Sequence, residues 1–335
     1  MIIARAPLRI SFVGGGTDLP DFYRQYPGRV FSVAIDKFTY VIANHIPHAK
    51  KIIVKYTQTE VVDNLDDLKH TRIREALRDL GIDKNIEIAS FADISSKSGL
   101  GSSSTFSVAL LKALNSYLGN SLSKQDIAEA ASRLEIDILK EPIGKQDQYA
   151  AAFGGFNVFQ FNSDESVDVK PVNILHKTKN DFQKHLILFF TGTTRDASSV
   201  LTEQKSNIAD KMEVLKNMSD SVFKFEELIL KGDFEQAGKM LDEAWKRKKS
   251  LASKISSNSF DKIYEEGINA GAWGGKILGA GGGGCMLFMA SPDKMANIKE
   301  KVVALANKEG LIGFEELPFK FTECGVDIVY RDDRK

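Results

Sequence analysis

Cysteine is scarce in this chain, since only Cys285 and Cys324 occur among 335 residues. Two cysteines are too few for a disulfide framework or for a cysteine-rich zinc site. Cys285 lies in an apolar run, where we expect a small buried side chain. No zinc-type spacing is present among the five histidines, which are His45, His48, His70, His176 and His185. The sequence therefore predicts neither a disulfide-stabilised scaffold nor a cysteine or histidine metal centre.

An excess of charge of one sign is also missing. Lys and Arg total 45, and Asp and Glu total 45, so the formal net charge is zero. A nucleic-acid binder usually carries a basic excess, and this balance argues against that class. No apolar stretch approaches the length of a membrane span, and the N-terminus lacks the regions of a signal peptide. We expect a cytoplasmic monomer or homodimer with a small-molecule substrate and no nucleic-acid or membrane partner.

The chain has the composition of a soluble globular protein, with 43% apolar and 27% charged residues. Strands are predicted at residues 2–6, 9–13, 30–35, 39–45, 51–56, 85–89, 156–161, 167–172, 186–191, 276–278, 285–290 and 325–330. Helices are predicted at residues 65–80, 103–118, 124–139, 196–230, 233–255, 260–270 and 292–307. A polar segment near 162–181 suggests a boundary. The sequence thus predicts an α+β fold with a first lobe of residues 1–180 and a helix-rich second lobe of residues 181–335.

The most informative glycine cluster lies in residues 97–105, which read Lys-Ser-Gly-Leu-Gly-Ser-Ser-Ser-Thr and precede an amphipathic helix. Glycines let the backbone approach an anion closely, and the N–H groups and dipole of a helix start favour negative charge. The serine hydroxyls add donors and a magnesium ligand. These features predict a phosphate-binding loop. From these residues alone, a serine-capped helix after a glycine turn is an equally good interpretation.

Two further glycine clusters accompany this loop. Residues 279–284 contain the pattern G-x-G-x-x-G, but an apolar strand-like run follows them, so the dinucleotide-binding fingerprint does not fit. We expect either a simple hairpin or a turn that lets another loop or a ligand pack against bare backbone. Residues 14–18 follow the predicted strand at 9–13, and they include Thr17 and Asp18. The carboxylate of Asp18 is suited to binding sugar hydroxyls and equally to capping the turn.

Two acids and two arginines are further candidates. Phosphoryl transfer needs a magnesium ligand and a group that orients or deprotonates the attacking hydroxyl. Glu135, on a predicted helix, and Asp147, at the start of an apolar stretch, could divide these roles, although capping or salt bridges explain them equally well. Arg9 could stabilise charge near Asp147 or be an ordinary solvated arginine. Arg195 could bind a substrate phosphate or form a salt bridge at a helix start.

Taken together, these segments resemble the superfamily of galactokinase, homoserine kinase, mevalonate kinase and phosphomevalonate kinase. Residues 6–18, 99–104 and 276–283 look like its three motifs, in order. The resemblance implies a two-lobed kinase fold that uses ATP and Mg²⁺. It assigns Asp147 as the catalytic acid, Arg9 as its supporting cation, and Ser103 and Glu135 as magnesium ligands. It implies substrate contacts from Thr17, Asp18, Arg195, Gly281 and Gly282, and phosphate contacts from Lys97, Ser98, Gly99, Leu100, Gly101, Ser102, Ser103 and Ser104.

The chain departs from that superfamily at two places. Ser95-Ser96-Lys97 stands where Pro-Pro-Gly is usual, which adds a cation near the phosphates, and Gly15-Gly16 replaces the Glu-His pair of galactokinase, which disfavours galactose. Residues 5–20, 141–149 and 191–195 are very similar to the bacterial D-glycero-D-manno-heptose 7-phosphate kinases, which implies phosphorylation of the anomeric hydroxyl to give the 1,7-bisphosphate. Alternatives are a fucokinase-like or other sugar-1-kinase and a catalytically silent, sugar-sensing relative.

Overall fold

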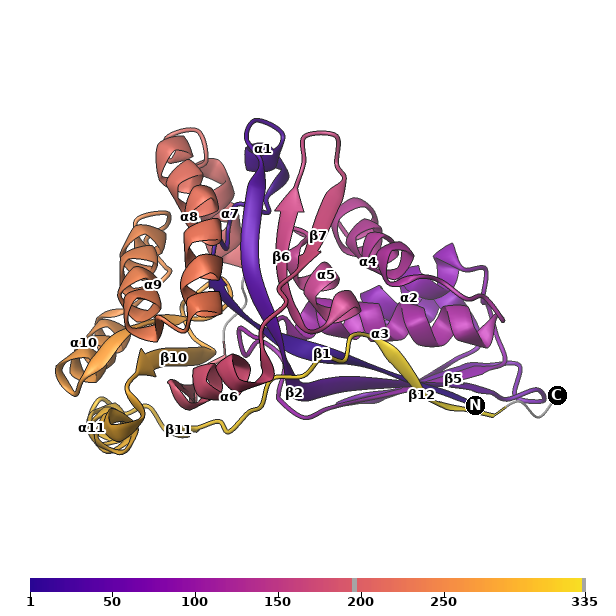
Figure 1. Ribbon diagram of the computed structural model, residues 1–335. Coiled ribbons are helices and arrows are strands. Elements are labelled where there is room, and N and C mark those ends of the chain that lie inside the picture. Colours follow the sequence, from indigo (N-terminus) through magenta and orange to yellow (C-terminus); the bar gives the residue numbers. More distant parts are fainter. Residues whose placement is uncertain (195–197, 333–335) are drawn as a thin grey trace.

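The computed structural model describes residues 1–194 and 198–332, and it places their strands in two sheets (Figure 1). In the first sheet the order is β12-β1-β2-β5-β3-β4, with β6 paired to β2 and β7 to β6. Its strands are β1 (Ile2–Val13), β2 (Gly28–His45), β3 (Ile52–Lys55), β4 (Thr59–Val62), β5 (Ile86–Ala92), β6 (Phe156–Phe161), β7 (Val167–Pro171) and β12 (Asp327–Arg331). The second sheet contains, in order, β11 (Phe314–Glu316), β8 (Leu186–Thr191), β10 (Cys285–Ala290) and β9 (Ala272–Ile277).

The strand β1 is longer than the sequence predicts. We expected two strands separated at Pro7 and Leu8, but a single strand runs through both residues, with an irregularity in its pairing to β2 between Pro7 and Arg9. Proline cannot donate a ladder hydrogen bond, and such an irregularity accommodates it. Residues 6–13 of β1 are all buried, so the strand crosses the centre of the molecule and carries Arg9 into it.

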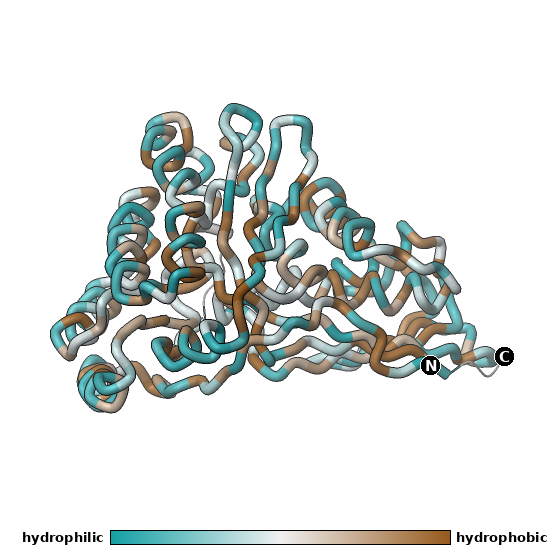
Figure 2. The backbone as a smooth tube through the Cα atoms, viewed as in Figure 1, coloured by the Kyte–Doolittle hydropathy of each residue, from teal (hydrophilic) through white to brown (hydrophobic). Residues whose placement is uncertain are grey.

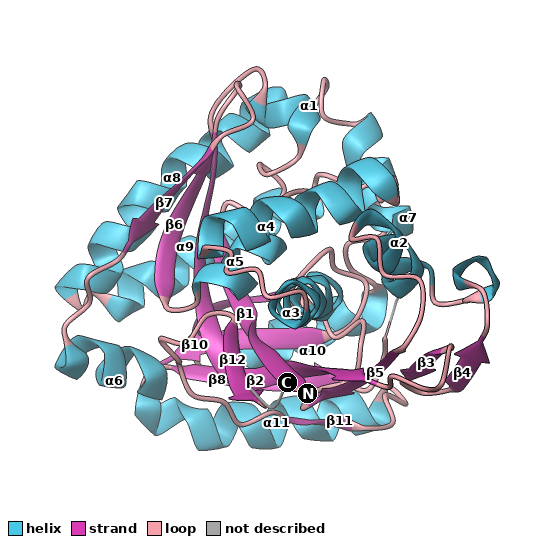
Figure 3. Cartoon of the chain, turned by 90° about the vertical axis from the view of Figure 1, so that its right-hand side faces the viewer, coloured by secondary structure: helices cyan, strands magenta, loops and turns pink. Residues whose placement is uncertain are grey.

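Helices cover the first sheet on the side that carries the glycine loop. In Figure 3, α3 is seen end-on beside the sheet, with α4 across it. The helices of the first lobe are α1 (Pro20–Tyr23), which lies apart at the end of β1, and α2 (Thr71–Asp79), α3 (Ser102–Tyr117), α4 (Lys124–Ser132) and α5 (Gln146–Phe153). The predicted helix at 124–139 continues beyond α4 as a π-helical turn, Arg133–Ile138. Helix α5 was not predicted, and it places Asp147 in its first turn.

The predicted helix at 65–80 is wrong in its first half. Only a 3₁₀ turn, Leu65–Asp67, precedes α2. The carboxylate of Glu60 accepts hydrogen bonds from the backbone N–H groups of Lys69 (2.6 Å) and His70 (3.1 Å). These bonds to a residue outside the segment hold the chain out of the helix until Thr71, and no local pattern reveals them.

The second lobe is helix-rich, as predicted, and α8 and α9 stand side by side at the left of Figure 1. The predicted helix at 196–230 is interrupted at residues 207–211, where the Asn207 side chain donates to the Leu251 carbonyl (3.0 Å). The helices of this part are α6 (His176–Lys184), α7 (Ser198–Ser206), α8 (Met212–Lys231), α9 (Phe234–Lys249), α10 (Asn258–Asn269) and α11 (Met295–Lys308).

The two lobes share a hydrophobic core. Leu8, Ile10 and Phe12 of β1 pack in one cluster with Phe225 of α8 and Leu287 of β10. Figure 2 shows apolar stretches concentrated on the central strands and polar stretches on the outer helices and hairpin ends. Among residues 1–194 and 198–332, no helix combines the length and apolar character needed to cross a membrane.

The predicted assignment of residues 181–335 to the second lobe needs one correction. The strand β12 pairs with β1 in the first sheet, in the register Ile2 with Arg331. Just before it, the Val326 N–H donates to the carbonyl of Ala152 in α5 (3.2 Å). The chain therefore returns to the first lobe and supports the helix that carries Asp147.

A chain ending at Cys324 should be destabilised by about 2–4 kcal/mol, because it loses the β12 ladder and the buried Val326 side chain. Chemical unfolding measures this difference. A chain ending at Asp332, which retains β12, is the matched control. Equal stability of the two truncated chains would contradict the placement of β12 in the first lobe.

Candidate active site

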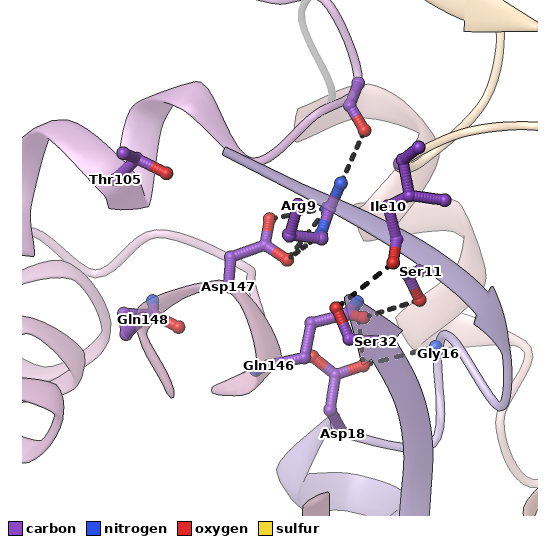
Figure 4. A network of polar contacts seen from close by, with 12 residues as sticks. Arg9, Ile10, Ser11, Gly16, Asp18, Ser32, Thr105, Gln146, Asp147 and Gln148 are labelled. Atoms are coloured by element: carbon purple, nitrogen blue, oxygen red, sulfur yellow. Dashed lines mark hydrogen bonds and ion pairs between the residues drawn. The ribbon is translucent and has the colours of Figure 1, made fainter. Parts of the chain in front are cut away.

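The centre of the site is an ion pair between Arg9 of β1 and Asp147 of α5 (Figure 4). The Arg9 guanidinium donates from Nε to Oδ1 and from Nη2 to Oδ2 of Asp147, both at 2.8 Å. Its third nitrogen, Nη1, donates to the Gly99 carbonyl oxygen at 2.6 Å. Arg9 is buried, whereas the Asp147 side chain is 24% exposed. The pair thus presents an oriented carboxylate, and the sequence predicted both residues.

The glycine loop lies directly against this pair. Gly101 is the N-cap of α3, with φ +80°, and a Cβ there would lie only 3.3 Å from the Asp147 carboxylate. The Leu100 carbonyl accepts from the Arg9 backbone N–H at 3.0 Å, which fixes the loop to β1. Ser98 is fully buried, and within the described residues its hydroxyl has no hydrogen-bond partner. The helix α3 therefore begins beside Asp147, and the N–H groups at a helix start are suited to binding phosphate.

The glycine cluster at 279–284 packs on the loop at 97–105. A Cβ on Gly284 would lie 2.4 Å from the Ser98 carbonyl oxygen, and one on Gly99 would lie 2.7 Å from that of Leu278. The expectation that residues 279–284 let another loop approach bare backbone is confirmed. The N–H of Gly282 already donates to the Ile255 carbonyl (2.8 Å), and Gly281 packs against the same residue. Substrate contacts by Gly281 and Gly282 stay predictions.

Asp18 is buried beside the Arg9–Asp147 ion pair. Its carboxylate accepts from the backbone N–H groups of Gly16 (3.1 Å) and Gln146 (3.2 Å). Burial raises the pKa of Asp18, and the nearby charge of Asp147 adds to this increase. Thr17 is fully buried, and among the described residues its hydroxyl bonds to backbone groups of Gly14 and Arg29. Asp18 therefore faces the site from the loop that Thr17 stabilises, and substrate contacts by both remain predictions.

Glu135 lies in the π-helical turn and is fully buried. Its carboxylate accepts from Ser107 (2.8 Å) and Gln148 (2.5 Å), and Arg72 lies 3.3 Å away. Burial raises the pKa of Glu135, while the charge of Arg72 and the hydroxyls of Ser104 and Ser107 act in the opposite direction. The π-helical turn supports a functional assignment, because such turns are frequent at functional sites.

The predicted magnesium ligands are only partly brought together. Ser104 is buried and close enough to lower the pKa of Glu135, whereas Ser103 is exposed. No cluster of three or more His, Cys, Asp or Glu side chains suited to a metal is present in residues 1–194 and 198–332. Mg²⁺ is usually held by one or two carboxylates together with substrate phosphates and water. Glu135 and one serine hydroxyl fit that pattern.

Two buried lysines complete the site, and the sequence analysis missed both. Lys276 of β9 donates to the carbonyl oxygens of Ser11 (2.8 Å) and Phe12 (2.9 Å), and burial lowers its pKa. Lys248 of α9 donates to the Gly279 carbonyl. Burial, with the charge of Arg9 as a second cause, lowers the pKa of Lys248 to about 8. The buried face of α9 could have revealed Lys248, because it lies four and three positions after Ala244 and Trp245.

Two predicted contacts are not established by the geometry. Arg195 lies outside the described residues. Lys97 has φ +64° at the start of the glycine loop, and its role toward the phosphates stays a prediction.

The chain matches two family models, GHMP kinases N terminal domain over residues 69–155 and GHMP kinases C terminal over residues 225–308. It belongs to the GHMP kinase family and is a phosphotransferase of the sugar kinase type. It is 30% identical to D-glycero-alpha-D-manno-heptose 7-phosphate kinase of Campylobacter jejuni, over 97% of this chain and 98% of that protein. The predicted family and two-lobed kinase fold are thereby confirmed.

Other relatives agree with this placement. A crystal structure of D-glycero-D-manno-heptose 1-phosphate kinase from Bacteroides thetaiotaomicron has a TM-score of 0.81 at 26% identity, covering 99% of this chain and 100% of that one. L-fucokinase/L-fucose-1-P guanylyltransferase of Bacteroides fragilis is 26% identical over 92% of this chain, which spans 36% of that protein. Lactococcus lactis galactokinase, at 16% identity, has the same fold, with a TM-score of 0.75 over 97% of this chain and 94% of that one.

Gly284→Ala should weaken binding of a non-hydrolysable ATP analogue by about tenfold or more, because the new methyl group would displace the Ser98 carbonyl and the loop behind it. Isothermal titration calorimetry measures this affinity. Gly232→Ala is the matched control, since Gly232 also has a positive φ (+75°) but open space around its Cα. Equal affinity in the two variants would contradict the packing argument.

Lys248→Met should change how stability depends on pH. The pKa of Lys248 is about 8 in the folded protein, below its ordinary value of 10.5. Below pH 8 the buried lysine is charged, and its burial destabilises the folded state. Above pH 8 the folded state loses this proton while the unfolded state keeps it, so the destabilisation becomes smaller. From pH 7 to 9.5 the wild type should gain about 2 kcal/mol relative to Lys248→Met. Urea unfolding at both pH values measures the difference, and a constant difference would contradict the assignment.

Proposed function

We propose that this kinase transfers the γ-phosphoryl group of ATP to the anomeric hydroxyl of D-glycero-D-manno-heptose 7-phosphate, giving the 1,7-bisphosphate and ADP. The observation that carries the chemistry is the oriented Asp147 carboxylate at the N-terminus of α3. The similarity to the heptose 7-phosphate kinase of Campylobacter jejuni over nearly the whole chain supports the choice of acceptor.

In this proposal Asp147 meets the acceptor hydroxyl. It orients the hydroxyl and takes its proton as the oxygen forms a bond to the γ-phosphorus, and the bond from that phosphorus to the bridging oxygen of ADP breaks. Arg9 holds both Asp147 oxygens, which fixes the carboxylate plane and offsets charge that develops beside it. The fully buried Arg9 cannot turn toward solvent without losing three hydrogen bonds.

The loop at 97–104 would hold the ATP phosphates through the backbone N–H groups at the start of α3 and the side chain of Lys97. Glu135, with Ser103 as predicted or its buried neighbour Ser104, would hold Mg²⁺. Bound magnesium neutralises charge on the phosphates. Arg195 is retained as the proposed contact for the phosphate already present on the sugar, and Asp18 as the contact for its hydroxyls.

A fucokinase-like activity is the second candidate. The similarity to the Bacteroides fragilis protein supports it, because that match extends over 92% of this chain. Turnover with heptose 7-phosphate, free heptose and L-fucose separates the two candidates, and we expect heptose 7-phosphate to give the highest kcat/KM. If none of these sugars causes ADP release, the result would instead favour a sugar-sensing protein. We further infer a cytoplasmic location and a monomer or homodimer.

Asp147→Asn should lower kcat by about 10²–10⁴-fold, because the amide cannot accept the hydroxyl proton. Affinity for a non-hydrolysable ATP analogue should change by less than about threefold, since phosphate binding is assigned to the loop and α3. Coupled ADP release and calorimetry measure the two quantities. Asp83→Asn, at an exposed position before β5, is the matched control. Wild-type turnover in Asp147→Asn would reject the assigned role.

A further inference from the structure

The turn that follows β1 is covered by side chains from the second lobe. Gln204 of α7 lies over Gly16, where an added Cβ would be 2.2 Å from the Gln204 amide nitrogen. Lys248 of α9 lies over Gly15, with its Nζ 4.0 Å from the position of an added Cβ. Helices α7 and α9 of the second lobe thus contact the turn at Gly15 and Gly16 in the first lobe.

Both side chains have unused hydrogen-bond donors. Gln204 is 2% exposed, and within the described residues its Nε2 has no partner. Lys248 is 6% exposed, and its ammonium group has three donors but one recorded acceptor in the described part, the Gly279 carbonyl. Buried donors are normally satisfied, and an unsatisfied one is unfavourable by about 1–3 kcal/mol. Such groups at the edge of a site indicate that a ligand supplies the missing acceptors.

The space beside Gly15 is lined by further polar groups. The Ser11 hydroxyl lies 3.6 Å and the Gln146 side-chain oxygen 4.0 Å from an added Cβ on Gly15. Ser11 donates to that oxygen (3.1 Å), and the Gln146 amide reaches toward Asp18 (3.5 Å). Gln146 directly precedes Asp147, so this polar space adjoins the catalytic carboxylate (Figure 4). Lys248 is close enough to interact with both Asp18 and Asp147.

We propose that Gln204 and Lys248 are acceptor-binding residues, which donate hydrogen bonds to oxygen atoms of the sugar next to the reacting hydroxyl. This inference rests on the proposed sugar kinase function and adds a specificity determinant to it. One donor over Gly16 and one near the Asp18 carboxylate suit an acceptor with neighbouring hydroxyl groups, since each hydroxyl both donates and accepts. Because α7 and α9 belong to the second lobe, residues of both lobes would hold the acceptor.

The test compares the steady-state constants of three variants with those of the wild type. Lys248→Met should raise the acceptor KM by about 10–100-fold, as expected for the loss of a charged hydrogen bond, and Gln204→Met by about 3–10-fold. Gly15→Ala should also raise it, because its Cβ fits sterically yet fills the polar space. In all three, the affinity for a non-hydrolysable ATP analogue should stay within about twofold of wild type. A purely structural role would not raise the acceptor KM while leaving the nucleotide affinity unchanged.

Lys249→Met is the matched control, because Lys249 is the next residue of α9 and pairs instead with Asp261 (3.0 Å). It should leave the acceptor KM unchanged. The assay uses the best acceptor of the wild type among heptose 7-phosphate, free heptose, L-fucose and galactose. If that acceptor is L-fucose, the proposed substrate is wrong, but the same variants still test the inference. An unchanged acceptor KM in both Lys248→Met and Gln204→Met would overturn the inference and leave the function intact. Turnover of none of the four sugars would overturn both.

Discussion

The bidentate ion pair between Arg9 and Asp147 is the interaction on which the rest of the site depends. Arg9 comes from the central strand β1, Asp147 from the first turn of α5, and the third donor of Arg9 binds the glycine loop at Gly99. One buried guanidinium therefore joins a strand, a helix and a loop that are far apart in sequence. Its fixed planar geometry suits this task, which the flexible ammonium group of lysine would perform less well.

Close backbone contacts around this pair bring the two lobes together. The glycine cluster at 279–284 packs on the loop at 97–105 without side chains between them, so the second lobe sets the position of a loop in the first. Lys276 of β9 reaches into the first lobe and binds two carbonyl oxygens at the end of β1. Lys248 of the second lobe likewise lies near the Asp18 and Asp147 carboxylates of the first. We attribute acceptor binding to this pairing of opposite charges.

Much of the fold could be predicted because its pattern is local. The strands at 156–161, 186–191 and 285–290 agree with β6, β8 and β10, since short apolar runs bounded by turn residues are typical of buried strands. Helix α3 begins one residue before its predicted start. The errors have tertiary causes. Glu60 caps the chain before α2 from outside the segment, and β12 returns to the first sheet because β1 has a free edge there.

The site could be predicted only where residue types form a recognisable motif. Arg9 and Asp147 were found because they match such motifs, and the structure joins them. Lys248 and Gln204 were missed because neither lies in a glycine-rich segment. Lys248 is one of four consecutive basic residues that read as a solvated helix end, and only its helical phase distinguishes it. Nothing local marks Gln204, whose proposed role rests on its contact with Gly16.

The most direct test of the central claim is a crystal structure with a non-hydrolysable ATP analogue and the acceptor sugar bound. The account predicts the polyphosphate at the N-terminus of α3, against residues 98–104, and the acceptor oxygen within about 2.6–3.2 Å of the Asp147 carboxylate. A triphosphate bound away from that helix, or an Asp147 side chain turned away from the acceptor, would contradict it.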